Sequence, residues 1–164
     1  MNYVILHMGE GKESYYRQAF EEYRKRMNSY GSLTSIPLKP AKTPGRELSP
    51  DEIRLALERE AEVFAEKLAE PKLAKSYKIA LCIEGKTMSS EELSTLFEKA
   101  AGSGRNTVVF LIGSSHGMTD ALKARAELRL SFSRMTFPHQ LARVLLCEQI
   151  YRAAEIARGS RYHK

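Results

Sequence analysis

The amino-acid sequence predicts an α/β fold in a single domain, with a mostly parallel sheet flanked by helices. Strand-like and helix-like patterns alternate along the whole chain, as they do in folds built from strand–helix–strand units. Residues 107–113 are an almost uninterrupted run of β-branched and aromatic side chains, which is typical of a parallel strand covered on both faces. The 164 residues suit one ordinary domain, and no repeat or linker divides them, so we expect one domain over residues 1–164.

The first part of the chain predicts two strands and one helix. Residues 2–8 are a short apolar run, which we expect to be a buried strand. Apolar side chains recur every three and four residues over 14–27, which puts them on one face of a helix. Residues 32–38 predict a weaker strand at a sheet edge, because Pro37 has no backbone N–H to donate.

Two later helices begin with the same signal. After a basic, proline-rich loop, Ser49 is followed by Pro50 and, three residues on, by Glu52. Ser89 and Glu92 repeat the spacing of a capping box. Because such a pair satisfies free N–H groups at a helix start, we expect a helix to begin at each place.

The second half of the chain predicts three strands, each followed by a loop. We expect strands over residues 77–83, 107–113 and 128–133, and loops over residues 84–88, 114–118 and 134–139. Thr119 is the expected N-cap of a helix over 119–128, and a last helix begins near residue 137. Parallel sheets bind ligands beyond the carboxyl ends of their strands, so these three loops are the expected site.

The composition indicates a soluble protein of a reducing compartment. Every long apolar run is interrupted well short of the ~20 residues that cross a bilayer, so we expect no membrane partner. The N-terminus lacks the features of a secretion signal. Cys82 and Cys147 belong to no CxxC pair or Cys/His cluster, so we expect reduced core thiols, a cytoplasmic location and no metal.

Basic residues are concentrated near the C-terminal end. Residues 120–164 contain nine Lys and Arg against four Asp and Glu, which accounts for +5 of the net charge of +6. Clustered Lys and Arg displace counterions from polyanions, a pattern typical of a nucleic-acid-binding face. The charge distribution alone is equally compatible with a basic surface that faces solvent and binds no nucleic acid.

Familiar nucleotide-binding and hydrolase motifs are incomplete or absent. The loop after the first strand has Ser14 where a dinucleotide-binding loop needs its third glycine. Residues 85–87 end like a phosphate-binding loop, but Ala80 occupies the required earlier glycine position within a strand. The sequence has no nucleophile elbow, no zinc-protease helix and no close group of catalytic carboxylates.

Three stretches of the sequence carry a resemblance to a known family. Residues 111–118 read LIGSSHGM, where Gly113 lets a ligand or another backbone approach the end of a strand. Residues 130–153 read LSFSRMTFPHQLARVLLCEQIYRA, and the chain ends in RYHK. In this order they resemble the RlmH family of ribosomal large subunit pseudouridine methyltransferases, in the SPOUT superfamily, and the resemblance runs the whole length of the chain.

The resemblance implies a SPOUT fold whose last helix is threaded through a C-terminal trefoil knot. The knot crevice of such proteins holds S-adenosylmethionine, mostly through backbone groups. Carried over by position, the pocket would be lined by Leu81, Gly113, Phe132, Ser133, Arg134, Met135, Thr136 and Phe137. Relatives in that family usually have a second glycine at the position of Ser114. The Cβ of Ser114 narrows the pocket, but we still expect the protein to bind S-adenosylmethionine.

The resemblance also implies methyl transfer to N3 of a pseudouridine in the 23S rRNA of assembled ribosomes. His163 and His139 are candidate bases, because an imidazole pKa near ~6.5 suits proton transfer at neutral pH. A structural role, as a cap or a packed ring, is favoured for His139. Tyr162 would stack on or hydrogen-bond the target base. Phosphate would be held by Arg161, Arg134 and Lys164.

The last helix is apolar on more than one side. Ala142 and Leu146 share one face of the helix, whereas Val144 lies on a different face. The sheet covers one side, and a second copy of the chain, as in the dimers of the family, is the expected cover for another. Arg143 is expected to pack its aliphatic stem on apolar surface with its charged head at an interface.

Two other classes of function are open. The first is a non-catalytic, basic RNA- or ribosome-binding module, which specific binding of S-adenosylmethionine would exclude. The second is a nucleotide-dependent α/β enzyme acting on a small metabolite, which activity on a free nucleotide without ribosomes would favour.

Overall fold

A single parallel sheet forms the centre of the protein. The computed structural model describes residues 1–11 and 13–159, and its five strands lie in the order β2-β1-β4-β3-β5, every neighbouring pair being parallel. The elements follow the chain as β1 (Asn2–Met8), α1 (Ser14–Met27), β2 (Ser32–Leu38), α2 (Pro50–Ala69), α3 (Pro71–Ala74), β3 (Tyr77–Thr87), α4 (Ser90–Gly102), β4 (Thr107–Ile112), α5 (Asp120–Lys123), β5 (Leu128–Ser131) and α6 (His139–Ala157).

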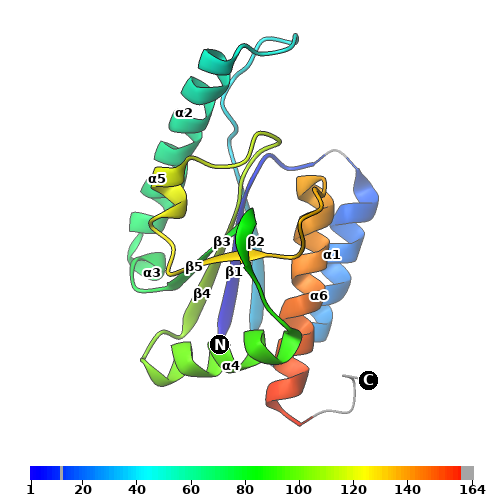
Figure 1. The fold of residues 1–164 in the computed structure, drawn as a ribbon. Coiled ribbons are helices and arrows are strands. Elements are labelled where there is room, and N and C mark those ends of the chain that lie inside the picture. Colours follow the sequence, from blue (N-terminus) through cyan, green and yellow to red (C-terminus); the bar gives the residue numbers. More distant parts are fainter. Residues whose placement is uncertain (12, 160–164) are drawn as a thin grey trace.

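Helices cover both faces of the sheet (Figure 1). One apolar core joins α1, α4 and α6 to one face, with Ile5 and Phe110 from the sheet fully buried in it. The second core joins α2, α3 and α5 to the other face, around Leu6 and Leu111. Neighbouring residues of one strand therefore enter opposite cores, because side chains alternate across a sheet. The predicted α/β class with a parallel sheet is confirmed.

Most predicted elements are confirmed near their expected bounds. β2, which contains Pro37, is an edge strand, and β4 is the central strand and almost wholly buried. Both capping boxes are formed, at Ser49 and at Ser89. Thr119 accepts a hydrogen bond from the Leu122 N–H at 3.1 Å and is the N-cap of α5.

The prediction of a loop over residues 84–88 is wrong, because β3 continues to Thr87. Leu81 and Lys86 both pair with Leu130 of β5, so residues 82–85 form a bulge between them. The strand continues because β5 supplies ladder partners beyond the bulge, where Thr87 pairs with Ser131. Bulges of this kind are common next to functional sites, since they redirect side chains.

The predicted helix over residues 119–128 is also wrong beyond its first turn. α5 ends at Lys123, and the chain then joins the sheet. The Glu127 N–H donates to the Lys78 carbonyl at 2.9 Å, and the Glu127 carboxylate accepts from the Lys78 N–H at 2.7 Å. Pairing with β3 therefore outweighs the helical preference of this segment. A short helix, α3, forms over Pro71–Ala74, between α2 and β3.

The last helix, α6, packs against α1 and α4 and buries much of its length. It begins at His139, after Pro138, and no side chain caps its first turn. The expectation that His139 serves as a cap is therefore wrong. Among the described residues, no helix is long and apolar enough to cross a membrane.

Candidate functional site

A cavity of about 710 Å³ lies at the carboxyl ends of β3, β4 and β5. Most of its walls come from three stretches: residues 81–84 of β3, residues 112–118 at and after the end of β4, and residues 131–139 from the end of β5 to the start of α6. Lys123 and Ala142 complete the lining. These stretches are far apart in sequence, and the parallel sheet brings them to one edge. The cavity therefore occupies the place where open parallel sheets bind their ligands.

The loop after β4 is a tight turn that leaves no room for a side chain at its start. A Cβ on Gly113 would lie 2.2 Å from the Gly117 carbonyl oxygen. Gly117 has a φ of +86° and donates its N–H to the Ser114 carbonyl at 2.9 Å. Gly117 is needed because L-residues rarely adopt such a φ, and Gly113 is needed because a side chain there would collide with the Gly117 backbone.

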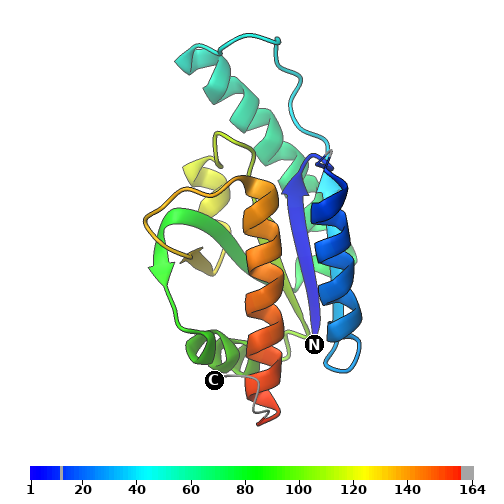
Figure 2. The ribbon, with the colours of Figure 1, turned by 90° about the vertical axis from the view of Figure 1, so that its right-hand side faces the viewer.

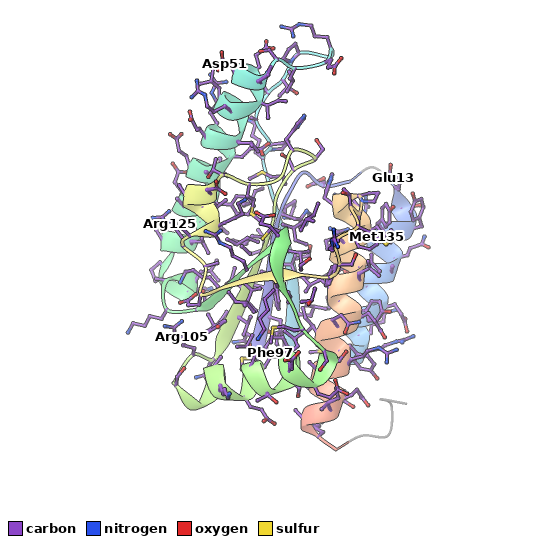
Figure 3. All side chains as sticks on the ribbon, viewed as in Figure 1. Glu13, Asp51, Phe97, Arg105, Arg125 and Met135 are labelled. Atoms are coloured by element: carbon purple, nitrogen blue, oxygen red, sulfur yellow. The ribbon has the colours of Figure 1, made fainter. Side chains whose placement is uncertain are left out.

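Aromatic and aliphatic side chains form the apolar walls of the cavity. The rings of Phe132 and Phe137 meet edge to face, with centroids 6.5 Å apart. Leu81 and Met118 contribute further apolar surface. Met135 lies in the loop before α6, lines the cavity and is 68% exposed (Figure 3).

The structure brings together nearly all the residues predicted to hold a cofactor. Those that line the cavity are Leu81, Gly113, Phe132, Ser133, Met135, Thr136 and Phe137. Arg134 is not among the lining residues, although both of its neighbours are. The predicted catalytic residues Arg161, Tyr162 and His163, together with Lys164, lie outside the described residues.

Hydrogen bonds within the loop before α6 fix its shape. The Met135 N–H donates to Ser133 Oγ at 3.0 Å, and Ser131 Oγ donates to the Ser133 carbonyl at 2.9 Å. Ser133 is therefore held on both its side chain and its backbone. This leaves the backbone of the loop ordered along the cavity wall, where N–H and C=O groups can read the edge of a base.

Sequence reasoning missed a charged pair at the cavity rim. Lys123 of α5 forms ion pairs with Glu84 in the β3 bulge and with Asp120, the latter at 2.8 Å. The hydrogen bond from Lys123 lowers the pKa of Glu84. No sequence signal pointed to this pair, because the bulge that carries Glu84 was predicted to be a loop and α5 a longer helix.

Cys82, which was not predicted to line the cavity, does so, and so does His139, a candidate base in the predicted loop 134–139. Burial raises the pKa of the Cys82 thiol above its usual value, so it is protonated at neutral pH. Burial, together with the charge of Arg143, lowers the pKa of the His139 imidazole. His139 is therefore neutral at pH 7 and has a lone pair available to accept a proton.

The hydroxyl of Ser114, in the cavity wall, is engaged in a hydrogen bond to a buried carboxylate. Its Oγ donates to Glu60 Oε2 at 2.8 Å, and Glu60 is only 6% exposed. Glu60 Oε1 also accepts from the Ala41 N–H at 3.2 Å. One buried carboxylate of α2 thus joins the cavity wall to the segment that leaves β2.

The expected position of the Arg143 head at an interface is wrong. Arg143 is 7% exposed, and its Nη1 donates to His7 Nε2 at 3.0 Å, with Ser35 Oγ at 3.4 Å. Burial, with the nearby charge of Arg143, lowers the pKa of His7 to about 4, so His7 is neutral and accepts this hydrogen bond. The guanidinium is held inside the protein by His7 near the end of β1 and Ser35 in the middle of β2.

The cavity has the size and lining of a cofactor site. Its volume lies in the range of ~300–1,000 Å³ typical of small-molecule pockets. Apolar walls flank an ordered backbone, which suits a nucleoside with an aliphatic tail. Within residues 1–11 and 13–159, no group of three or more His, Cys, Asp or Glu side chains is placed to bind a metal ion.

Comparison with known proteins assigns the chain to a family. A family model described as "Predicted SPOUT methyltransferase" matches residues 1–163. The ribosomal RNA large subunit methyltransferase H of Bacillus pumilus (strain SAFR-032) is 43% identical over 164 residues, the whole of both chains. The protein of the same name from Clostridium acetobutylicum is 42% identical over the same full length.

A solved structure agrees on the fold. A probable methylase family protein from Haemophilus influenzae Rd KW20 superposes with a TM-score of 0.51 at 9% identity, covering 99% of this chain and 70% of that one. The full-length match to the family model and the identity to complete relatives are together decisive. The chain belongs to the SPOUT methyltransferase family, and within it to the ribosomal RNA large subunit methyltransferase H proteins.

Proposed function

We propose that this protein uses S-adenosylmethionine to methylate N3 of a pseudouridine in the 23S rRNA of the assembled ribosome. The observation that carries the proposal is the cavity beyond β3, β4 and β5, whose lining includes seven of the eight residues expected from the family resemblance. The full-length identity to ribosomal RNA large subunit methyltransferase H proteins supports the choice of substrate.

The residues of the cavity suit S-adenosylmethionine. The backbone of residues 132–137 would read the adenine edge, and Leu81 and Phe137 would cover its faces. The bare backbone at Gly113 lets the Gly117 carbonyl pack directly against it, which sets the shape of the loop at the cavity wall. The cofactor supplies a sulfonium methyl group to an in-line nucleophile.

The protein must position the target base and remove its N3 proton. Holding N3 in line with the methyl group converts a bimolecular step into a unimolecular one, which supplies much of the rate. His163 is the proposed base, with Tyr162 stacking on the target and Arg161 binding phosphate. His139, as a neutral imidazole on the cavity wall, is the second candidate for the base.

The proposal includes a trefoil knot at the C-terminal end, a homodimer and a cytoplasmic location. The segment between β5 and α6 lines the cavity beside the loops after β3 and β4, which is the arrangement that a knot would require. A dimer would bring the C-terminal residues of one copy to the cavity of the other. Sedimentation of the purified protein tests the dimer, and a fully active monomer would overturn it.

The decisive experiment combines the protein, S-adenosylmethionine and ribosomes that lack the modification. Mass spectrometry of the 23S rRNA should find one new methyl group, on N3 of a pseudouridine. Deleting residues 161–164 should abolish methylation and leave the cofactor affinity, measured by calorimetry, nearly unchanged. A protein that binds ribosomes but not S-adenosylmethionine would instead be a non-catalytic RNA-binding module.

A further inference from the structure

The segment between β2 and α2 projects beyond the rest of the molecule. Residues 39–49 and the first turns of α2 extend past the other elements in both ribbon views (Figure 2). Asp51 marks the outer end of α2 (Figure 3). Most of the segment is exposed, and it forms neither helix nor strand. Its side chains are therefore presented to whatever approaches the carboxyl edge of the sheet.

The first eight residues of this segment are basic in net charge. Residues 39–46, here named the basic arm, contain Lys39, Lys42 and Arg46 and no acidic residue. Arg46 is paired with Glu52 of α2 at 2.6 Å, which compensates its charge. Within the described part of the chain, neither lysine forms an ion pair, and both are exposed. The basic arm therefore presents two lysine side chains whose positive charges are not compensated by an ion pair to any described residue.

The basic arm begins beside the cavity. Ala41, which lies between the two lysines, donates its N–H to Glu60 Oε1 at 3.2 Å. The other oxygen of the same carboxylate accepts from Ser114 Oγ, in the cavity wall, at 2.8 Å. One buried carboxylate therefore links the backbone of the arm to the cavity wall.

We propose that Lys39 and Lys42 of the basic arm bind RNA phosphates that flank the nucleotide entering the cavity. This inference rests on the proposed function, in which the ligand at the cavity mouth belongs to a polyanion. Lysine is suited to this task, because a flexible ammonium binds phosphate as a point charge without demanding one geometry. Such contacts fix the position of the RNA and carry no sequence information.

The test is the variant Lys39→Ala/Lys42→Ala, measured for binding to ribosomes that lack the modification. Loss of two phosphate contacts should weaken binding by about three- to tenfold near 0.15 M salt and reduce the salt dependence of log Kd by about 1 to 2. The affinity for S-adenosylmethionine should not change. The variant Lys39→Arg/Lys42→Arg should keep both the affinity and the salt dependence of the wild type.

The matched control is Lys72→Ala/Lys75→Ala, which removes two exposed lysines near α3, at the opposite end of β3. If both alanine variants lose the same affinity, net charge alone is responsible and the arm has no special role. If the arm variant binds like the wild type, the inference is wrong while the proposed function stands. If the wild type itself neither binds nor methylates these ribosomes, the proposed function fails first.

Discussion

Ser114 Oγ donates to Glu60 Oε2 across 2.8 Å, and this bond fastens the loop after β4 to the middle of α2. The two residues are 54 positions apart, and Glu60 is buried. The side chain of Ser114 therefore anchors the cavity wall to α2.

Ser114→Ala should destabilise the protein and weaken cofactor binding. The change leaves a buried carboxylate oxygen without its donor, which should lower the free energy of unfolding by about 1–3 kcal/mol. The affinity for S-adenosylmethionine should fall severalfold, since the loop loses its anchor. Urea unfolding and calorimetry measure the two effects. Ser115→Ala, in the exposed part of the same loop, is the control, and equal losses in both variants would contradict this account.

Gly113→Ala should disrupt the cavity itself. The new Cβ would lie 2.2 Å from the Gly117 carbonyl oxygen, and backbone cannot move aside as a flexible side chain does. We expect a loss of about 1–3 kcal/mol in the free energy of unfolding and no measurable S-adenosylmethionine binding. Gly102→Ala, where a Cβ would meet nothing within 4 Å, should be neutral or stabilising. Cofactor binding by Gly113→Ala at wild-type affinity would refute the role given to this turn.

The stability of the protein should depend on the protonation of His7. Its pKa is about 4 in the folded protein and near 6.5 when unfolded, so the unfolded chain binds the proton more tightly. Stability is therefore complete above pH 6.5 and is lost as the pH falls towards 4, by up to about 3 kcal/mol from this residue. Urea unfolding between pH 4.5 and 7.5 measures the loss.

The variant His7→Gln separates this contribution from the titration of carboxylates over the same range. An amide oxygen can still accept from Arg143 but does not titrate, so the pH dependence of the variant should be shallower. His116→Gln, in the exposed part of the loop after β4, should behave like the wild type. Parallel curves for His7→Gln and the wild type would mean that His7 is not the titrating group.

The two cysteines should react differently with iodoacetamide. Cys82 lies on the cavity wall, whereas Cys147 is fully buried and its pKa is raised to about 12 by burial. Cys82 should therefore be alkylated in the native protein and Cys147 only after unfolding. S-adenosylmethionine at ten times its Kd should slow the alkylation of Cys82 by about tenfold. Peptide mass spectrometry measures both sites, and labelling of Cys82 at a rate independent of the cofactor would place the ligand elsewhere.

Local signals in the sequence predicted most of the fold correctly. The capping boxes at Ser49 and Ser89 and the apolar run of β4 depend on neighbouring residues, so they are visible in the sequence. The two wrong predictions, at residues 84–88 and 119–128, share one cause. In each case β3 and β5 pair with each other, and a hydrogen-bonded ladder between distant segments outweighs the preference of either segment alone.

The sequence by itself determined the α/β class and seven of the residues that line the cavity, because the class follows from periodic patterns and these lining residues from a family motif. Only the tertiary structure decided the bulge that brings Cys82 and Glu84 to the cavity and the bond between Ser114 and Glu60. It also decided that Arg143 contacts His7, 136 positions away. Such contacts depend on how distant segments pack, and no local pattern of residue types encodes them.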